Sequence, residues 1–293
     1  MVPIPDPSAR TYPSQGVVYI STGNYLDEAC LSVSSLKQTM PDVHVTVFTE
    51  REPPSNLFDR WIKIEDPIHS GRDKVIQLKN TPYHKTIYLD SDTYVAEPLD
   101  DMFSMLEDYD FMGVIEDARG YWYGDETGVP KPFPEINAGV LAFRKTVPIT
   151  HILNRWDIEY EKSISWQRNY GSRIWDQPSL RKLLWEGRKD IKLAVLPSEY
   201  NLLSTWGSFL FGDPIIIHTR NKPARMLERM RRHKNNDRVH LGQIGCVRSP
   251  YDMTFAEWFV TFAKIHAVFF LAFFKIFPNQ KRTRRAQTSD NSG

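Results

Sequence analysis

The chain has 293 residues, 41% of them hydrophobic, which is enough to bury one large core or two small ones. Its formal net charge of +1 gives no strong overall field, so we expect no nucleic-acid partner. Its two cysteines, Cys30 and Cys246, allow neither a disulfide framework nor a zinc site, and they favour a reducing compartment.

The first third of the chain predicts alternating strands and helices. Residues 1–15 are rich in proline and polar side chains and lack the apolar core of a signal peptide, so we expect a flexible arm. Apolar runs with β-branched residues predict strands over residues 16–21, 44–49, 61–64 and 85–89. Helical spacing of apolar residues, ended by a proline, predicts helices over residues 25–40 and 71–80.

The same alternation continues through the middle of the chain. Strands are predicted over residues 111–115, 138–143, 192–197 and 214–218, and helices over residues 148–162 and 175–186. A long loop, Glu116–Glu135, contains aromatic residues, glycines and prolines, which suit either a lid or acceptor platform or a loop packed on its own aromatics. This order predicts an α/β protein with a mostly parallel sheet flanked by helices on both faces.

Two carboxylates separated by one residue follow the predicted strand 85–89. Asp and Ser are ordinary turn formers, so Asp90-Ser91-Asp92 is consistent with a simple turn. Two carboxylates with this spacing can also bind one hard divalent cation and leave room for a phosphate. Ligands of open α/β sheets bind outside the carboxyl ends of strands, where both this segment and His218 are predicted to lie. The position therefore favours a metal site.

Four segments, taken together and in order, resemble a known family. They are "VVYISTGNYLDEACLSVSSL", "YHKTIYLDSDTYV", "INAGVLAFRK" and "WDQPSL". They are similar to the opening strand, loop and helix, the D-x-D segment, the N-a-G-v-l strand and the D-Q-x-x-L segment of GT-A-fold glycosyltransferases. The resemblance covers residues 16–223 and is strongest to the family of glycogenin and the lipopolysaccharide galactosyl- and glucosyltransferases, glycosyltransferase family 8.

The resemblance implies a set of metal ligands. Asp90, Asp92 and His218 would hold Mn²⁺ or Mg²⁺, which would bridge the two phosphates of a nucleotide sugar. The chain departs from the family after this histidine, because "HTRNKP" lacks the expected glycine and brings Lys222 close. Lys222 and Arg220 are weaker candidates for diphosphate contacts, and a strand-end histidine with an ordinary hydrogen bond is the alternative for His218.

The resemblance also implies donor-binding and catalytic residues. Donor contacts are expected from Thr22, Asn24, Tyr25, Arg72, Lys74, Ser91, Asn137, Ala138, Gly139 and Lys222. Asp176 and Gln177 are the expected catalytic residues, which would bind sugar hydroxyls or stabilise oxocarbenium charge. Structural alternatives exist for several of these: a helix N-cap for Asp176, helix-start packing for Tyr25 and a solvated helix face for Arg72 and Lys74.

The implied function is metal-dependent transfer of a sugar, with retention, from a nucleotide diphosphate donor such as a UDP-sugar to a glycan or lipid-linked acceptor. Three alternatives are weaker. A phosphatase of the haloacid dehalogenase type needs a Thr or Val where Tyr94 lies, and a second acidic segment. A sugar nucleotidyltransferase needs a glycine-rich loop with a lysine. A non-catalytic sugar-binding protein would not need the acids and the Asp-Gln pair.

The C-terminal part has a different character. Phenylalanines recur at helical spacing from Phe255 to Phe277, interrupted by charged residues, and a basic cluster follows. This predicts an amphipathic helix in the membrane interface, on the cytoplasmic inner face. Packing on the catalytic domain or a homodimer contact is the alternative. The predicted units are an arm (1–15), a catalytic domain (16–248), this helix (249–277) and a basic disordered tail (278–293).

Overall fold

The computed structural model describes most of the predicted catalytic domain. The described residues are 13–54, 56–116, 127–169, 174–203, 207–220, 222–231, 238–241 and 246–248. The predicted arm up to residue 12, the centre of the long loop at residues 117–126, and the predicted C-terminal helix and tail lie outside these ranges.

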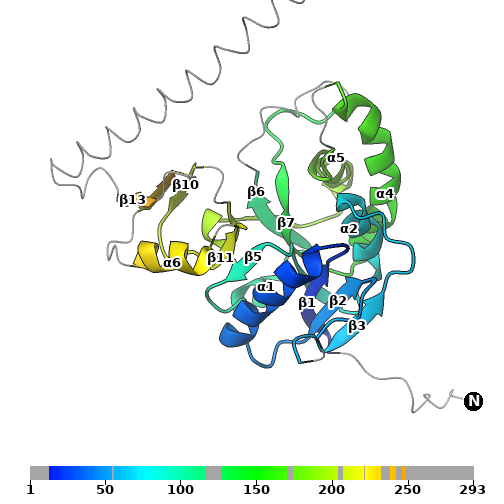
Figure 1. The fold of residues 1–293 in the computed structure, drawn as a ribbon. Helices are drawn as coiled ribbons and strands as arrows, with labels where there is room; N and C mark the ends of the chain where they lie inside the picture. Colours follow the sequence, from blue (N-terminus) through cyan, green and yellow to red (C-terminus); the bar gives the residue numbers. More distant parts are fainter. Residues whose placement is uncertain are drawn as a thin grey trace, which may run out of the picture.

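A seven-stranded sheet forms the centre of the molecule (Figure 1). Its strands, in spatial order, are β3 (Arg60–Lys63), β2 (Val45–Thr49), β1 (Gln15–Ile20), β4 (Lys85–Leu89), β7 (Ile136–Arg144), β6 (Phe111–Ile115) and β8 (Leu193–Leu196). Only β7 runs antiparallel to its neighbours. The mostly parallel sheet predicted from the sequence is therefore confirmed.

Helices cover both faces of this sheet, because alternate strand residues point to opposite sides. On one face, Val17 and Tyr19 of β1 pack in the cluster formed by α1 (Tyr25–Thr39) and α3 (Asp100–Met105). On the other face, Val18 and Ile20 pack with α2, α4 and α5. These helices span Gly71–Gln77, Val147–Gln167 and Gln177–Gly187, and a 3₁₀ turn, Leu78–Asn80, extends α2.

The predicted strand 214–218 does not join the large sheet, which corrects the expectation that it is the last strand there. It forms β11 (Ile216–His218), which lies between β5 (Thr93–Val95) and β9 (Leu202–Leu203) in a separate three-stranded sheet. The short strand β5, which starts directly after the Asp90-Ser91-Asp92 turn, was not predicted. The antiparallel pairing sets His218 opposite Thr93.

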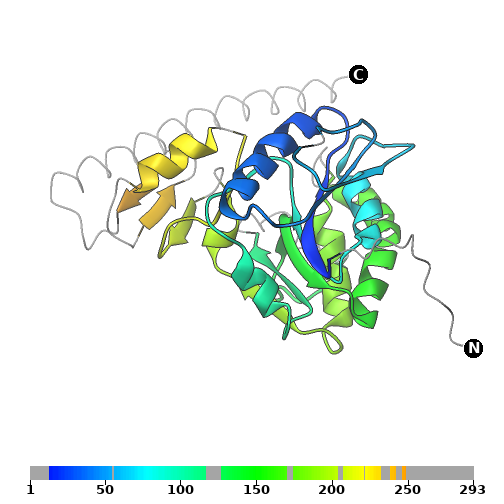
Figure 2. The ribbon, with the colours of Figure 1, turned by 90° about the horizontal axis from the view of Figure 1, so that it is seen from below.

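A third, small sheet follows at the end of the described chain. It contains β10 (Gly207–Leu210), β12 (Arg238–Leu241) and β13 (Cys246–Arg248), and α6 (Pro223–Arg231) lies beside it (Figure 2). A short 3₁₀ helix, Ser198–Tyr200, precedes β9. Among the helices of the described residues, none has the length and apolarity needed to cross a membrane.

Candidate metal and donor-binding site

A cleft of about 690 Å³ opens at the carboxyl ends of β1 and β4 and beside the amino end of the antiparallel β7. Most of the predicted site residues line it: Thr22, Tyr25, Lys74, Asp90, Ser91, Asp92, Asn137, Gly139, Asp176, Gln177 and His218. Residues separated by more than 190 positions in the chain thus meet at one edge of the sheet. This is the edge at which ligands of open α/β sheets bind.

Three side chains in the cleft form a group that could hold one metal ion. One ligand atom from each of Asp90, Asp92 and His218 lies within 4.8 Å of the other two. The two carboxylates follow β4, and β11 presents the histidine through its pairing with β5. Carboxylate oxygens and an imidazole nitrogen are both used as ligands of divalent cations. The residues therefore fit a divalent cation.

The charges of this group stabilise one another. His218 Nε2 lies 3.0 Å from Asp92 Oδ1 and 3.8 Å from Asp90 Oδ2. Burial opposes the charge on Asp92, but the hydrogen bond and charge of His218, together with the Arg220 guanidinium, lower the pKa of Asp92 to about 2. Burial also opposes the charge on His218 and by itself would lower its pKa. The two aspartates outweigh this effect, so the pKa of His218 is raised. A divalent cation would take the place of the imidazolium proton.

Lys74 crosses the floor of the cleft and holds two acids together. Its Nζ lies 2.5 Å from Asp176 Oδ2, 3.4 Å from Asp90 Oδ1 and 3.0 Å from the carbonyl oxygen of Ala138. Burial opposes its charge, but the two carboxylates raise its pKa above the ordinary value. Because its contacts are internal, Lys74 organises the site from below and does not occupy a solvated helix face.

Tyr88, which the sequence did not single out, supports the first metal-ligand candidate. Its hydroxyl donates a hydrogen bond to Asp90 Oδ1 at 2.5 Å. Burial raises the pKa of this phenol well above its ordinary value, and the negative charge of Asp90 adds to the shift. The phenol therefore stays protonated and remains a donor. The alternation of side chains along β4 turns Tyr88 to the face that carries α2, α4 and α5.

Gln177 has a defined orientation in the cleft. Its Nε2 donates to Glu116 Oε2 at 2.8 Å, and Asn137 Nδ2 donates to the same oxygen at 2.7 Å. A carboxylate accepts only, so both amides must turn their NH₂ groups toward it. Asp176, at the N-cap position of α5, makes no side-chain capping bond and pairs with Lys74 instead. Helix capping therefore does not account for this aspartate.

Gly139, a predicted donor contact that lines the cleft, also makes room for a neighbouring side chain. A Cβ atom at this position would lie 2.2 Å from His218 Cε1 and 2.7 Å from its Nδ1. The missing side chain leaves the space that the imidazole ring of His218 occupies. Glycine is thus required here by a protein side chain from another sheet.

Four predicted donor-binding residues are not brought to the cleft surface as side chains. Arg72 turns the other way and forms ion pairs with Asp157 and Glu161 of α4. Asn24 lies exposed at the start of α1, and Lys222 is exposed before α6 with φ 46°. Ala138 contributes its carbonyl group to Lys74. For Arg72 the reason is electrostatic, because two acids on α4 hold its guanidinium.

The entrance of the cleft carries an exposed aromatic ring and a cation. Tyr25 is 45% exposed, and the guanidinium of Arg220 lies 5.4 Å from its ring centroid. Beneath them, Thr22 donates to the buried carboxylate of Asp73 at 2.8 Å. Asp73 also completes a capping box with Ser70 at the start of α2. The spacing S-x-x-D in the sequence could have indicated this cap.

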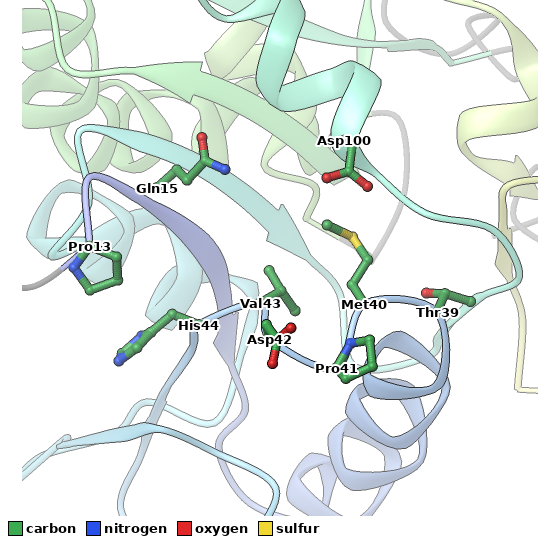
Figure 3. A pocket seen from close by; sticks show the side chains of 9 residues that line it. All are labelled: Pro13, Gln15, Thr39, Met40, Pro41, Asp42, Val43, His44 and Asp100. Atoms are coloured by element: carbon green, nitrogen blue, oxygen red, sulfur yellow. The ribbon is translucent and has the colours of Figure 1, made fainter.

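A second cavity of about 480 Å³ lies at the opposite, amino ends of β1 and β2 (Figure 3). Gln15 and His44 from these strand ends line it, with Met40 and Asp42 from the end of α1 and the following turn, and Asp100 from the start of α3. The residues predicted to bind donor or metal do not line it. We therefore place the functional site at the carboxyl edge.

The fold is shared with known glycosyltransferases, whereas comparisons of the whole sequence find no match. No protein-family model matches the chain, and no curated protein matches it at a significant level. A crystal structure of the galactosyltransferase LgtC in complex with donor and acceptor sugar analogues is similar, with a TM-score of 0.52 and 16% sequence identity. The similarity covers 74% of this chain and 94% of that one.

A structure of an active-site mutant of LgtC is similar to the same extent, with a TM-score of 0.50 and 17% identity. These likenesses confirm the GT-A fold class that the sequence predicted. Membership of glycosyltransferase family 8 remains a prediction.

Proposed function

We propose that this chain is a metal-dependent glycosyltransferase that moves a sugar from a nucleotide diphosphate donor, a UDP-sugar, to a glycan or lipid-linked acceptor. The observation that carries the proposal is the group of Asp90, Asp92 and His218 inside a cleft at the carboxyl edge of a GT-A sheet. The similar LgtC structure contains donor and acceptor sugar analogues, which supports the same two kinds of ligand for this cleft.

Asp90, Asp92 and His218 would hold the cation, Mn²⁺ or Mg²⁺. When bound, a divalent cation neutralises the negative charge of the departing diphosphate. Arg220, at the cleft entrance beside Asp92, would add a positive charge on the phosphate side. The ring of Tyr25 offers an exposed face against which a nucleotide base can pack.

Gln177 and Asp176 would act on the sugar. Because Glu116 holds Nε2 of Gln177, the carbonyl oxygen Oε1 is the group left to face a developing oxocarbenium ion. Asp176 and Asn137 would bind sugar hydroxyls. We propose retention of configuration, because Glu116 Oε2 accepts two amide N–H groups, which disfavours this carboxylate as a base for an inverting attack.

The phosphatase alternative receives no support from the cleft. It would use Asp90 as a nucleophile and would need a further acidic pair nearby. Within the described residues, the metal-ligating group at Asp90 consists of Asp92 and His218, and Lys74 and Tyr88 bind Oδ1 of Asp90. These contacts suit a fixed metal ligand better than a nucleophile.

The test is the linkage between metal and donor binding. UDP should raise the unfolding temperature much more with Mn²⁺ than with a chelator, because a ligand bound only to the folded state stabilises it by mass action. Asp92→Asn should abolish the Mn²⁺-dependent increment and leave the fold intact.

A panel of nucleotide sugars with Mn²⁺, followed by hydrolysis and by the anomeric configuration of the product, should identify the donor and the stereochemistry. Equal stabilisation by UDP in chelator and in Mn²⁺ would contradict the proposal. A β-linked product from an α-linked donor would contradict retention alone.

A further inference from the structure

Asn201, which the sequence did not single out, lies behind the histidine of the candidate metal site. It is buried, with 3% of its surface exposed, directly before β9. Its Oδ1 lies 3.0 Å from His218 Nδ1, and its Nδ2 lies 2.9 Å from Asn137 Oδ1. It therefore contacts the ring nitrogen of His218 that faces away from Asp92.

The direction of these hydrogen bonds follows from a backbone group that cannot be reversed. The amide N–H of Gly139 donates to Asn137 Oδ1 at 2.9 Å, which fixes this atom as an oxygen. The other end of the Asn137 amide faces the carboxylate of Glu116, which accepts only, and this requires the NH₂ group there. Both neighbours thus impose the same orientation on Asn137.

The orientation of Asn137 determines that of Asn201. An acceptor at Asn137 Oδ1 requires the NH₂ group of Asn201 opposite it, so the carbonyl oxygen of Asn201 must face His218. A carbonyl oxygen accepts only. The Nδ1 atom of His218 must therefore carry the proton of this hydrogen bond. The absence of a Cβ at Gly139 lets the ring take up this place.

We infer that Asn201 is a positioning residue for metal binding: it holds His218 in the form that keeps the proton on Nδ1 and presents Nε2 to the cation. The inference deepens the proposed function and rests on it. A metal-ligating histidine commonly donates its second N–H to such a partner, which fixes the ring and the tautomer. Here the backbone N–H of Gly139 determines the orientation of the Asn137 amide. That amide determines the orientation of Asn201, which in turn determines the protonated nitrogen of His218.

The experiment measures Mn²⁺ binding to the full chain by the electron paramagnetic resonance of free Mn²⁺, without donor and with UDP. Asn201→Ala should weaken Mn²⁺ binding about 10- to 100-fold, the usual effect of losing a partner behind a metal ligand. Asn201→Asp should keep the wild-type affinity or exceed it, because a carboxylate still accepts from Nδ1. Asn80→Ala, which removes an exposed amide that binds Gln77, is the control and should bind like wild type.

Asn201→Asp also separates positioning from general support of the fold. Its second carboxylate oxygen would face Asn137 Oδ1, so we expect a lower unfolding temperature in chelator together with retained Mn²⁺ affinity. A purely structural role would make affinity fall with stability in both variants, and that result would overturn the inference. Equal Mn²⁺ binding by wild type and a folded Asn201→Ala would overturn it as well.

The outcomes distinguish this inference from the proposed function. If Mn²⁺ binds, and Asn201→Ala weakens it, but no nucleotide sugar is turned over, the transferase proposal fails and the positioning role stands. If donors are turned over and Asn201→Ala binds Mn²⁺ like wild type, only the positioning role fails. If wild type binds no Mn²⁺ with or without UDP, both are wrong.

Discussion

Gly139 illustrates, at the residue scale, how one missing side chain determines the site. The ring of His218 occupies the space beside the Cα of Gly139. His218 ends β11, which lies in the three-stranded sheet of β5, β11 and β9. A β-carbon at this position would overlap the imidazole ring, so the two groups cannot both keep their places. The glycine therefore makes room for the candidate metal ligand His218.

We expect Gly139→Ala to displace His218. The added Cβ would lie 2.2 Å from His218 Cε1, so the ring must shift, and overpacking of this kind costs about 1–3 kcal/mol. Mn²⁺ affinity and the free energy of unfolding in chelator should both fall. Gly212→Ala is the matched control, because a Cβ there meets no atom within 4 Å. Unchanged Mn²⁺ affinity in Gly139→Ala would contradict this account.

Lys74 is the second residue on which the site depends, because it holds the acids Asp90 and Asp176 together while buried. Lys74→Met should leave Asp176 buried without its cation, which costs about 3–5 kcal/mol. Adding Asp176→Asn should recover part of this loss. Urea unfolding of the two single variants and the double variant measures the coupling.

Lys63→Met is the control for Lys74→Met. It removes an ion pair with Glu65 in which both side chains are more than half exposed, so it should cost less than about 1 kcal/mol. If both substitutions lowered the free energy of unfolding by a similar amount, the ion pair of Lys74 under the cleft would have no special structural role.

At the scale of elements, the pairing of β5 with β11 brings the candidate metal ligands together. The turn at Asp90-Ser91-Asp92 leads from β4 of the large sheet into β5 of the smaller sheet. β11 then runs antiparallel to β5, and the backbone N–H of Thr219 donates to the carbonyl oxygen of Asp92 at 2.8 Å. The two sheets thus meet at this turn, and the candidate ligands Asp90, Asp92 and His218 lie where they meet.

Thr219→Pro tests this arrangement, because proline has no backbone N–H and would leave the Asp92 carbonyl without that donor. We expect His218 to lose its position and Mn²⁺ affinity to fall at least about tenfold, the low end for disturbing the surroundings of a metal ligand. The far-ultraviolet circular dichroism should stay close to wild type, because β11 lies outside the large sheet. Thr219→Ala keeps the N–H and should bind Mn²⁺ like wild type. A proline variant with full affinity would contradict a role for this pairing.

At the scale of the whole molecule, the C-terminal segment concerns where the protein acts and on which acceptor. The phenylalanine-rich segment Phe255–Phe277 and the basic residues after it lie outside the described residues. From its sequence we propose a helix in the membrane interface, with the transferase acting at the cytoplasmic face on a lipid-linked acceptor.

The full chain should bind vesicles of anionic lipid at low salt and should bind neutral vesicles less. A chain ending at Ser249 should lose this binding and keep hydrolysis of the donor, measured by vesicle sedimentation and donor turnover. The opposite pattern, no vesicle binding or an unfolded truncated protein, would assign the segment to the core or to a homodimer contact.

The sequence by itself determined the features that depend on neighbours along the chain. Periodicity predicted β4 and β6 with their observed bounds, and the alternation of strands and helices predicted the sheet. The carboxylates of Asp90 and Asp92 were located because they directly follow a recognisable strand. These are local properties, and the spacing of residues over a short stretch of the chain is enough to predict them.

Only the tertiary structure decided which distant side chains meet. Asp92 and His218 are 126 positions apart, and Asn137 and Asn201 are 64 apart. The spacing of apolar residues predicts neither the short strand β5 nor the direction in which Arg72 points. Each depends on a partner from another element, β11 for β5 and Asp157 of α4 for Arg72. The role of Gly139 likewise depends on a ring from another sheet. Local spacing carries no record of such contacts, since they form only when the two sheets meet.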